Sequence, residues 1–358
     1  MTIYHLLSDR HSADIRRYVS DLCRALAADA HDVHLVCRRA MADSLHDNVA
    51  QIHTMRLGGA WDILTPIRLS KLWDSHDEGV TVHVHTLRDA STAIRTRNLC
   101  RHPDRIRILL SLHHNRRTRA PKTAMNMYNE MDGIILPSEH ALTRFIGEMP
   151  DIRHRERLHA AIPCLNHPVQ GLTPKSTAPA PFLFNIIFTG PINADSGLEV
   201  LVLALASIPD KPWHLHVCGT GDPRVTMPVV HLSRGRNIDS RISWHGDEVD
   251  PASVITQCHI CVIPYRGPDL QSFTIIEHMS HGVAVVAADT GGATEIITPG
   301  VDGITVPPNR PEVLAEALSR LMSDHHAMAR IAADGQRTAT DRLSFQKHYN
   351  TITALYRQ

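Results

Sequence analysis

The stretch from Asp269 to Glu295 reads Asp-Leu-Gln-Ser-Phe-Thr-Ile-Ile-Glu-His-Met-Ser-His-Gly-Val-Ala-Val-Val-Ala-Ala-Asp-Thr-Gly-Gly-Ala-Thr-Glu. Ser272 is expected to cap a short helix, Gly282 to end it, and residues 283–288 to form a buried strand. A helix of about nine residues is only some 13 Å long, so its free amino-terminal NH groups favour an anion such as a phosphate. Asp269 and Glu277 flank that position, where an acid is tolerated if it faces hydroxyl groups, as on a sugar or a ribose.

This pattern resembles the signature of the retaining glycosyltransferases of the large GT-B family 4, in which an acid, seven residues and Glu precede Ala-Met-x-x-Gly and a valine-rich strand. The resemblance implies that Asp269 contacts the donor sugar. It implies that the amides around Ser272, Phe273 and Thr274 contact the donor phosphates and sugar, and that Glu277 binds the ribose hydroxyls. The family usually has Glu where this chain has Asp269. A solvated helix cap with a surface Glu is the alternative, but it leaves the acid spacing and the following Gly-Gly turn unexplained.

The composition indicates a two-domain globular protein. The chain has 358 residues, of which 43% are hydrophobic and 21% charged, and this excludes wholesale disorder. The formal net charge is zero and aromatic residues are only 4%, so nucleic acid is not an expected partner. The first half carries a small excess of Lys and Arg.

Cysteines and histidines raise the question of a metal. Seven scattered cysteines make a disulfide framework improbable, and Cys258-His-Ile-Cys261 has no second pair and reads as small core residues. The pairs His83/His85 and His214/His216 alternate along expected strands and are more often satisfied or exposed imidazoles than ligands. No 18-residue apolar run and no signal peptide are recognisable, so we expect a cytoplasmic protein without a metal or other cofactor.

The first half alternates strands and helices. Residues 2–8 and 33–37 read as strands around a helix at 15–28, which opens a parallel sheet. Where related enzymes usually carry a Gly-Gly turn near the donor phosphates, residues 8–18 contain no glycine. Arg10, Arg16 and Arg17 could approach an anionic donor or acceptor there, although a basic helix start is more often a solvated face.

Two further strands, 80–85 and 106–112, end in histidine-rich sequence, and strand ends are where open α/β sheets bind ligands. By the resemblance, His113 takes the place of a histidine near the donor sugar and acceptor; a strand-end histidine that only caps a loop is the alternative. The basic run 116–122 could serve an anionic acceptor or a lipid surface, and a solvated loop is at least as probable. Peripheral membrane contact through this basic domain is therefore an open prediction.

The second half begins after a loose Pro/Ser/Thr tract at 167–181. Strand 182–189 is followed by the loop 190–197 and a helix at 198–208. By the resemblance, Gly190 begins a donor-binding loop whose Arg and Lys grip the diphosphate, but here Pro191 and Ser196 occupy those places. Arg266 is the nearest candidate to replace them.

Several strands of the second half complete the expected order. The strand 214–218 runs into Gly219-Thr-Gly221, which is weak evidence alone but matches the family's donor-side Gly-x-Gly. Strands at 242–246 and 260–263 precede the acid pair, and helices follow at 311–323 and 345–356.

We therefore predict two Rossmann-like α/β domains of the GT-B type with a cleft between them. Residues 1–170 form the acceptor-side domain and 181–340 the donor domain, and 341–358 form a helix that returns to the first domain.

The resemblance implies transfer of a hexose, with retention, from a UDP- or GDP-sugar to a hydroxyl of a saccharide or lipid-linked acceptor, as in polysaccharide or glycoconjugate synthesis. No metal is required if the helix dipole and cations hold the diphosphate. A catalytically silent partner subunit of the same fold would explain the missing Arg and Lys, and an epimerase or phosphorylase would share the sheet order.

Overall fold

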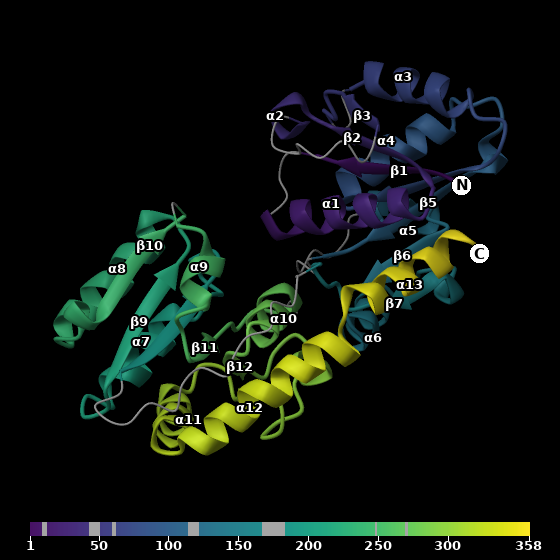
Figure 1. Cartoon of the computed structure of the whole chain (residues 1–358). Helices are drawn as coiled ribbons and strands as arrows, with labels where there is room; N and C mark the ends of the chain where they lie inside the picture. Colours follow the sequence, from purple (N-terminus) through teal and green to yellow (C-terminus); the bar gives the residue numbers. More distant parts are fainter. Residues whose placement is uncertain are drawn as a thin grey trace. The chain divides into compact units, whose positions relative to one another are not determined.

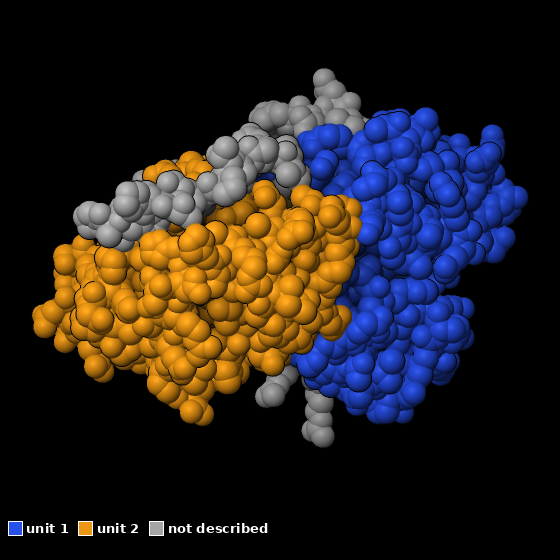
Figure 2. Space-filling model, turned by 60° about the horizontal axis from the view of Figure 1, so that its bottom comes forward, with its two compact units in different colours: residues 1–166, 345–358 blue, residues 167–344 orange. Residues whose placement is uncertain are grey.

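The structure is a computed structural model that describes residues 1–8, 13–42, 51–58, 62–113, 122–166, 183–247, 249–268 and 271–358. Its contacts divide the chain into two compact units (Figures 1 and 2). Unit 1 comprises Met1–Asn166 with Phe345–Gln358, and unit 2 comprises His167–Ser344. The terminal segment that belongs to unit 1 therefore begins at residue 345, compared with the expected 341.

Unit 1 contains a parallel sheet of seven strands in the order β3-β2-β1-β4-β5-β6-β7. The strands are β1 (Thr2–Leu7), β2 (Asp32–Cys37), β3 (Gln51–Thr54), β4 (Val80–Val84), β5 (Ile106–Ser111), β6 (Gly133–Leu136) and β7 (Leu158–Ala160). The helices are α1 (Ala13–Ala28), α2 (Arg39–Ala42), α3 (Leu64–Trp73), α4 (Leu87–Arg97), α5 (Lys122–Asn129), α6 (Glu139–Glu148) and α13 (Phe345–Tyr356).

Unit 2 contains a parallel sheet of six strands in the order β10-β9-β8-β11-β12-β13. The strands are β8 (Phe184–Thr189), β9 (Trp213–Cys218), β10 (Ile242–Gly246), β11 (Ile260–Ile263), β12 (Ala284–Ala288) and β13 (Ile304–Val306). The helices are α7 (Leu198–Ala206), α8 (Pro223–Gly235), α9 (Pro251–Ile255), α10 (Ser272–Ser280), α11 (Pro311–Ser323) and α12 (His325–Arg337). The expected architecture of two parallel sheets is confirmed.

Successive side chains of a strand point to opposite faces of the sheet, so the two faces of the sheet in unit 1 pack against different helices. On one face, side chains such as Tyr4, Val82 and Ile108 join a buried core with residues of α3, α4, α5 and α6. On the other face, His83 reaches Tyr356 of α13. Helix α13 thus closes unit 1 from the far end of the sequence (Figure 1).

The core of unit 2 lies between the strands and helices α7, α8, α11 and α12. Its strands β11 and β12 are continuous apolar runs, because the centre of a parallel sheet is buried on both faces. All seven cysteines are buried free thiols, and Cys258 and Cys261 are fully buried, as expected for core residues. No helix among the described residues has the length and apolar character needed to cross a membrane.

Candidate active site

Unit 2 has its topological switch point between β8 and β11. From β8 the strand order runs to β9 and β10 on one side, and to β11, β12 and β13 on the other. The connections that leave neighbouring strands at such a point diverge and leave a crevice at the carboxyl ends, where open α/β sheets bind ligands. The loop 190–197 follows β8, and residues 264–271 follow β11. These are the two segments that the sequence assigns to the donor.

The glycines of these loops are required by close backbone packing. Gly219 has φ +142°, and a Cβ atom there would lie 2.0 Å from the carbonyl oxygen of Gly190. A Cβ atom on Gly221 would lie 2.0 Å from the carbonyl oxygen of Ile192. The two loops are joined by backbone hydrogen bonds from Gly190 N to Cys218 O (3.0 Å) and from Ile192 N to Thr220 O (2.9 Å). The Gly-x-Gly sequence thus lets the β9 loop lie directly against the β8 loop.

Arg266 is held against the β8 loop. Its Nε donates to the carbonyl of Ala194 (2.8 Å), and its guanidinium lies 2.6 Å from a carboxylate oxygen of Glu199 at the start of α7. The Arg266 side chain remains 31% exposed. Its charge is therefore partly balanced by Glu199 while one part of the group still faces solvent, and the sequence alone did not reveal this acidic partner.

Helix α10 follows the β11 loop. Ser272 is the first residue of the helix rather than its cap, so this expectation was wrong by one residue: Gln271 is the cap, and its side chain makes no capping hydrogen bond. Gly282 ends the helix as predicted, with φ +63°. Phe273, Thr274 and Glu277 are half-buried in the first two turns. Asp269 lies outside the described residues.

In unit 1 the switch point lies between β1 and β4. His5 is on β1, His85 directly follows β4, and His113 follows β5. Nδ1 of His85 is 3.1 Å from Nε2 of His113, and Nε2 of His85 is 3.2 Å from Nδ1 of His5. The three buried imidazoles form a hydrogen-bonded chain that ends at His113, the histidine singled out in the sequence.

Burial keeps the first imidazole of this chain uncharged. It lowers the pKa of His5 to about 3, so His5 is neutral at physiological pH. Among the described residues, Nε2 of His5 has no hydrogen-bond partner. An unpartnered buried N–H is rarer than an unpartnered acceptor, which favours a proton on Nδ1 of His5 and donation along the chain toward His113. His113 then accepts at Nε2.

A small pocket adjoins His113. It encloses about 190 Å³ of empty space, including the part open to solvent, and is lined by Tyr18, Ser111, Leu112, His113, Ile135, Leu136, Pro137, Ala161, Pro163 and His348. The Tyr18 hydroxyl and Nε2 of His348 are 2.8 Å apart, and burial lowers the pKa of His348 to about 4. The pocket therefore presents hydrogen-bonding side chains on an otherwise apolar lining.

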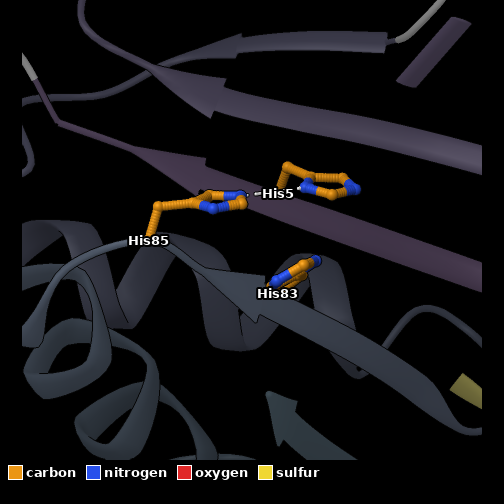
Figure 3. Close-up of side chains that lie close together, drawn as sticks. All are labelled: His5, His83 and His85. Atoms are coloured by element: carbon orange, nitrogen blue, oxygen red, sulfur yellow. Dashed lines mark hydrogen bonds between the residues drawn. The ribbon is translucent and has the colours of Figure 1, made fainter. Parts of the chain in front are cut away.

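His5, His83 and His85 can be tested as metal ligands, since one ring nitrogen of each lies within 4.8 Å of the others (Figure 3). His83, however, already uses both nitrogens, at 2.7 Å from the Tyr356 hydroxyl and 2.7 Å from the Ser111 hydroxyl. Both nitrogens of His85 are also engaged, in the chain described above. This cluster is built as a hydrogen-bond network, and the expectation that His83 and His85 are satisfied imidazoles is confirmed.

Two family models match most of the chain between them. The model for glycosyltransferase family 4 matches residues 15–156, and the model for glycosyl transferases group 1 matches residues 184–324. The chain is a GT-B glycosyltransferase similar to those of family 4. The two matches fall on different units, so both halves of the molecule carry the family pattern.

Relatives with curated names match the chain over about half its length. It is 31% identical over 189 residues to an exopolysaccharide phosphotransferase of Streptomyces coelicolor, covering 49% of this chain and 19% of that protein. It is 26% identical over 176 residues to an alpha-D-kanosaminyltransferase of Streptomyces kanamyceticus, covering 48% and 45%. The match therefore spans less than half of either relative.

Solved structures show the same GT-B fold. A glycosyltransferase from Rickettsia africae ESF-5 superposes with a TM-score of 0.84 at 17% identity, covering 99% of this chain and 97% of that one. Anabaena Alr3699/HepE in complex with UDP superposes with a TM-score of 0.82 at 17% identity, covering 99% of both chains.

Several residues of the candidate site were not predicted from the sequence. They are Glu199, which pairs with Arg266, and the pocket and chain residues His5, Tyr18, Ser111 and His348. His5 and His85 are 80 residues apart, and Tyr18 and His348 are 330 apart. Only the register of the parallel strands and the return of α13 bring them together. Of the other candidates, Arg10 and the run 116–121 lie outside the described residues.

Proposed function

We propose that this chain transfers a hexosyl group, with retention, from a UDP- or GDP-sugar to a hydroxyl of a saccharide or lipid-linked acceptor in polysaccharide or glycoconjugate synthesis. The bond between the sugar C1 and the diphosphate oxygen breaks, the bond between C1 and the acceptor oxygen forms, and the acceptor proton is released. The observation that carries the proposal is the β8 and β11 loops at the switch point of unit 2, followed by α10 with Glu277 in its second turn.

In this proposal unit 2 holds the donor. The amino end of α10, at Ser272, Phe273 and Thr274, offers backbone NH groups and a positive dipole end to the diphosphate. Glu277 accepts hydrogen bonds from the ribose hydroxyls, and Asp269 contacts the sugar. The Gly190, Gly219 and Gly221 loops shape the opening. Anabaena Alr3699/HepE has been solved in complex with UDP and with UDP-glucose, which supports a nucleotide-sugar donor here.

His113 is proposed to act from unit 1, as a neutral hydrogen-bond donor near the transferred sugar. Its tautomer is fixed through His85 and His5. A metal is not required if the helix dipole and Arg266 stabilise the leaving diphosphate. Contact of the basic first unit with a membrane surface remains a prediction.

The test is a nucleotide-sugar panel on the full chain. The true nucleotide should protect the wild type against unfolding by about 2.7 kcal/mol at a hundred times its dissociation constant. Product analysis by NMR should show an α-linked product from an α-linked donor, with EDTA causing no loss of transfer. Asp269→Asn should reduce transfer while binding of the free nucleotide stays nearly the same, because this acid is expected to meet only the sugar.

One observation favours a second candidate, a catalytically silent partner subunit. Pro191 and Ser196 replace the cations of the family pattern, and Arg266, their nearest substitute, is paired with Glu199. A silent subunit would show no nucleotide protection with any member of the panel. An epimerase would instead release free nucleotide in the absence of an acceptor.

A further inference from the structure

A second histidine cluster in unit 1 has the geometry of a metal site. It lies on the opposite face of the sheet from the His5–His85–His113 chain, under helix α3. One ligand atom from each of Asp32, His34 and His76 lies within 4.8 Å of the other two. Asp32 and His34 are two residues apart on β2 and so share one face of the sheet, and His76 follows α3.

The ligand atoms are spaced as a small tetrahedral ion needs them. Nε2 of His34 is 3.0 Å and Nδ1 of His76 is 4.0 Å from Oδ2 of Asp32. Zinc bonds of about 2.0–2.2 Å to nitrogen and oxygen place neighbouring ligands of a tetrahedron about 3.4 Å apart. The two imidazole rings meet nearly at right angles, at 73° with 5.4 Å between centroids. The two distances to Asp32 therefore lie on either side of the tetrahedral spacing.

The other nitrogen of each imidazole is already held in place. Nδ1 of His34 is 2.9 Å from Nε2 of His53, and Nε2 of His76 is 2.9 Å from the hydroxyl of Tyr4. Tyr4 also stacks on the His34 ring, at 4.2 Å between centroids. Such outer contacts orient metal-binding histidines and fix which nitrogen keeps the proton. In the His5–His83–His85 cluster, by contrast, the same bonds use up the nitrogens that a metal would need.

The Asp32–His34–His76 cluster is also more open to solvent than the buried His5–His83–His85 cluster. The Asp32 side chain is 43% exposed and that of His76 is 21% exposed, whereas His34 is 5% exposed. An ion can therefore enter from solvent, and a water molecule can take the fourth position.

We propose that Asp32, His34 and His76 bind a zinc-like divalent ion that stabilises unit 1. Two imidazoles and one carboxylate suit Zn²⁺ and its neighbours in the first transition series better than Mg²⁺ or Ca²⁺. Asp32 begins β2 and pairs with Thr2, the first residue of β1. The site thus lies at the amino ends of the strands, opposite the carboxyl ends that carry His85 and His113. The ion links β2 to the α3–β4 connection, and its role is independent of the proposed transfer.

Binding also implies a defined proton shift. Without the ion, Nε2 of His34 donates to the Asp32 carboxylate, because a carboxylate only accepts. With the ion, Nε2 offers its lone pair, so His34 carries its proton on Nδ1 and donates to His53. Ion binding therefore removes the proton from Nε2 of His34.

The test is a titration of the full chain, stripped of metal with EDTA, with Zn²⁺ and with Co²⁺. Wild type is expected to bind the ion, to show the visible absorption of tetrahedral Co²⁺, and to unfold at a higher temperature with Zn²⁺. Asp32→Asn and His76→Gln should each weaken binding by more than about tenfold, and His53→Gln by about 10- to 100-fold. Nucleotide binding and transfer should not change in Asp32→Asn.

Two matched controls locate the ion. His245→Gln removes an imidazole that is also paired with a histidine, at 3.0 Å from His216 in unit 2, and His85→Gln breaks the buried chain of unit 1. Both should keep the wild-type metal affinity. The proposal is overturned if wild type binds neither ion, if Asp32→Asn and His76→Gln bind as wild type does, or if His85→Gln alone abolishes binding. Circular dichroism shows which variants are folded. Asp32 and His76 are partly exposed, so if only one of Asp32→Asn and His76→Gln folds, its metal affinity is sufficient to test the proposal.

Discussion

At the scale of single residues, Glu277 is the side chain whose proposed role is easiest to separate from folding. It is half-buried in the second turn of α10, and the ribose hydroxyls would donate to its charged carboxylate. Glu277→Gln should therefore weaken nucleotide binding by about 1.5–3 kcal/mol, the value of a charge-assisted hydrogen bond, and change the free energy of unfolding little. Calorimetric titration with UDP and GDP measures the first quantity and urea unfolding the second.

The matched control for this change is Glu316→Gln. Glu316 lies on α11 of the same unit, and its exposed side chain pairs with Arg320 one turn away. It should bind nucleotide as the wild type does. If Glu277→Gln binds nucleotide with unchanged affinity, the ribose role is wrong.

Variants of Arg266 and Glu199 test whether Arg266 takes the place of the diphosphate-binding Arg and Lys of the family pattern. Arg266→Ala should weaken binding of a nucleoside diphosphate by about 1.5–3 kcal/mol and binding of the nucleoside much less, since only the diphosphate meets the guanidinium. Glu199→Gln breaks the same 2.6 Å ion pair but keeps the cation, so diphosphate binding should hold or improve.

Comparing Arg266→Ala with Glu199→Gln separates the effect of the Arg266 charge on the diphosphate from its effect on the conformation of the β8 loop. Arg266 also donates to the carbonyl of Ala194, so its removal loosens the β8 loop. Equal losses in Arg266→Ala and Glu199→Gln would mean that loop support, and not the cation, matters. Equal binding of nucleoside and nucleoside diphosphate by wild type would favour the silent partner subunit.

At the scale of elements, the sequence predicts most of the sheet but little of the histidine network. The strands β1, β2, β4, β5, β8, β9, β10, β11 and β12 were recognised in the sequence, because residues that are buried in a parallel sheet are mostly apolar. The short strands β3 (Gln51–Thr54), β7 (Leu158–Ala160) and β13 (Ile304–Val306) were missed, because three or four residues carry too little periodicity. The imidazole chain was missed because it depends on register: the pairing of β1 with β4 sets His5 opposite His83, two residues before its partner His85.

The same buried histidines make the folded state sensitive to acid. Burial lowers the pKa of His348 from 6.5 to about 4, so between these pH values the unfolded chain binds a proton that the folded chain does not. Stability should be full above pH 6.5 and fall as the pH drops toward 4, by roughly 3 kcal/mol for this residue. Urea unfolding from pH 7.5 to 4.5 measures the slope.

His348→Gln is the informative variant for this slope. Glutamine can still bond to the Tyr18 hydroxyl, 2.8 Å from the ring in wild type, but it does not titrate. The variant should lose less stability than wild type between pH 6.5 and 4.5. An unchanged slope would mean that His348 does not contribute to the acid sensitivity.

At the scale of the whole molecule, the chain forms most of unit 1 first, then unit 2, and ends in helix α13, which belongs to unit 1. Tyr356 lies 2.7 Å from Nδ1 of His83, and Arg107 donates to the Tyr356 carbonyl at 3.1 Å. Tyr349 donates to Asp29 at 2.6 Å. These contacts span 249–320 residues of sequence, so unit 1 cannot complete its fold before the last helix has been made.

Tyr356→Phe tests whether α13 stabilises only the unit to which its contacts assign it. The change leaves Nδ1 of the fully buried His83 without its hydroxyl partner, and an unsatisfied buried polar group costs about 1–3 kcal/mol. Native-state hydrogen exchange should speed up in β4 and β5 and stay the same in β8 and β9, whose core contains no residue of α13. Nucleotide affinity should not change, because the proposed donor residues lie in unit 2. Equal acceleration in both sheets would show that the two units unfold as one cooperative body, and the assignment of α13 to the stability of unit 1 alone would then be wrong.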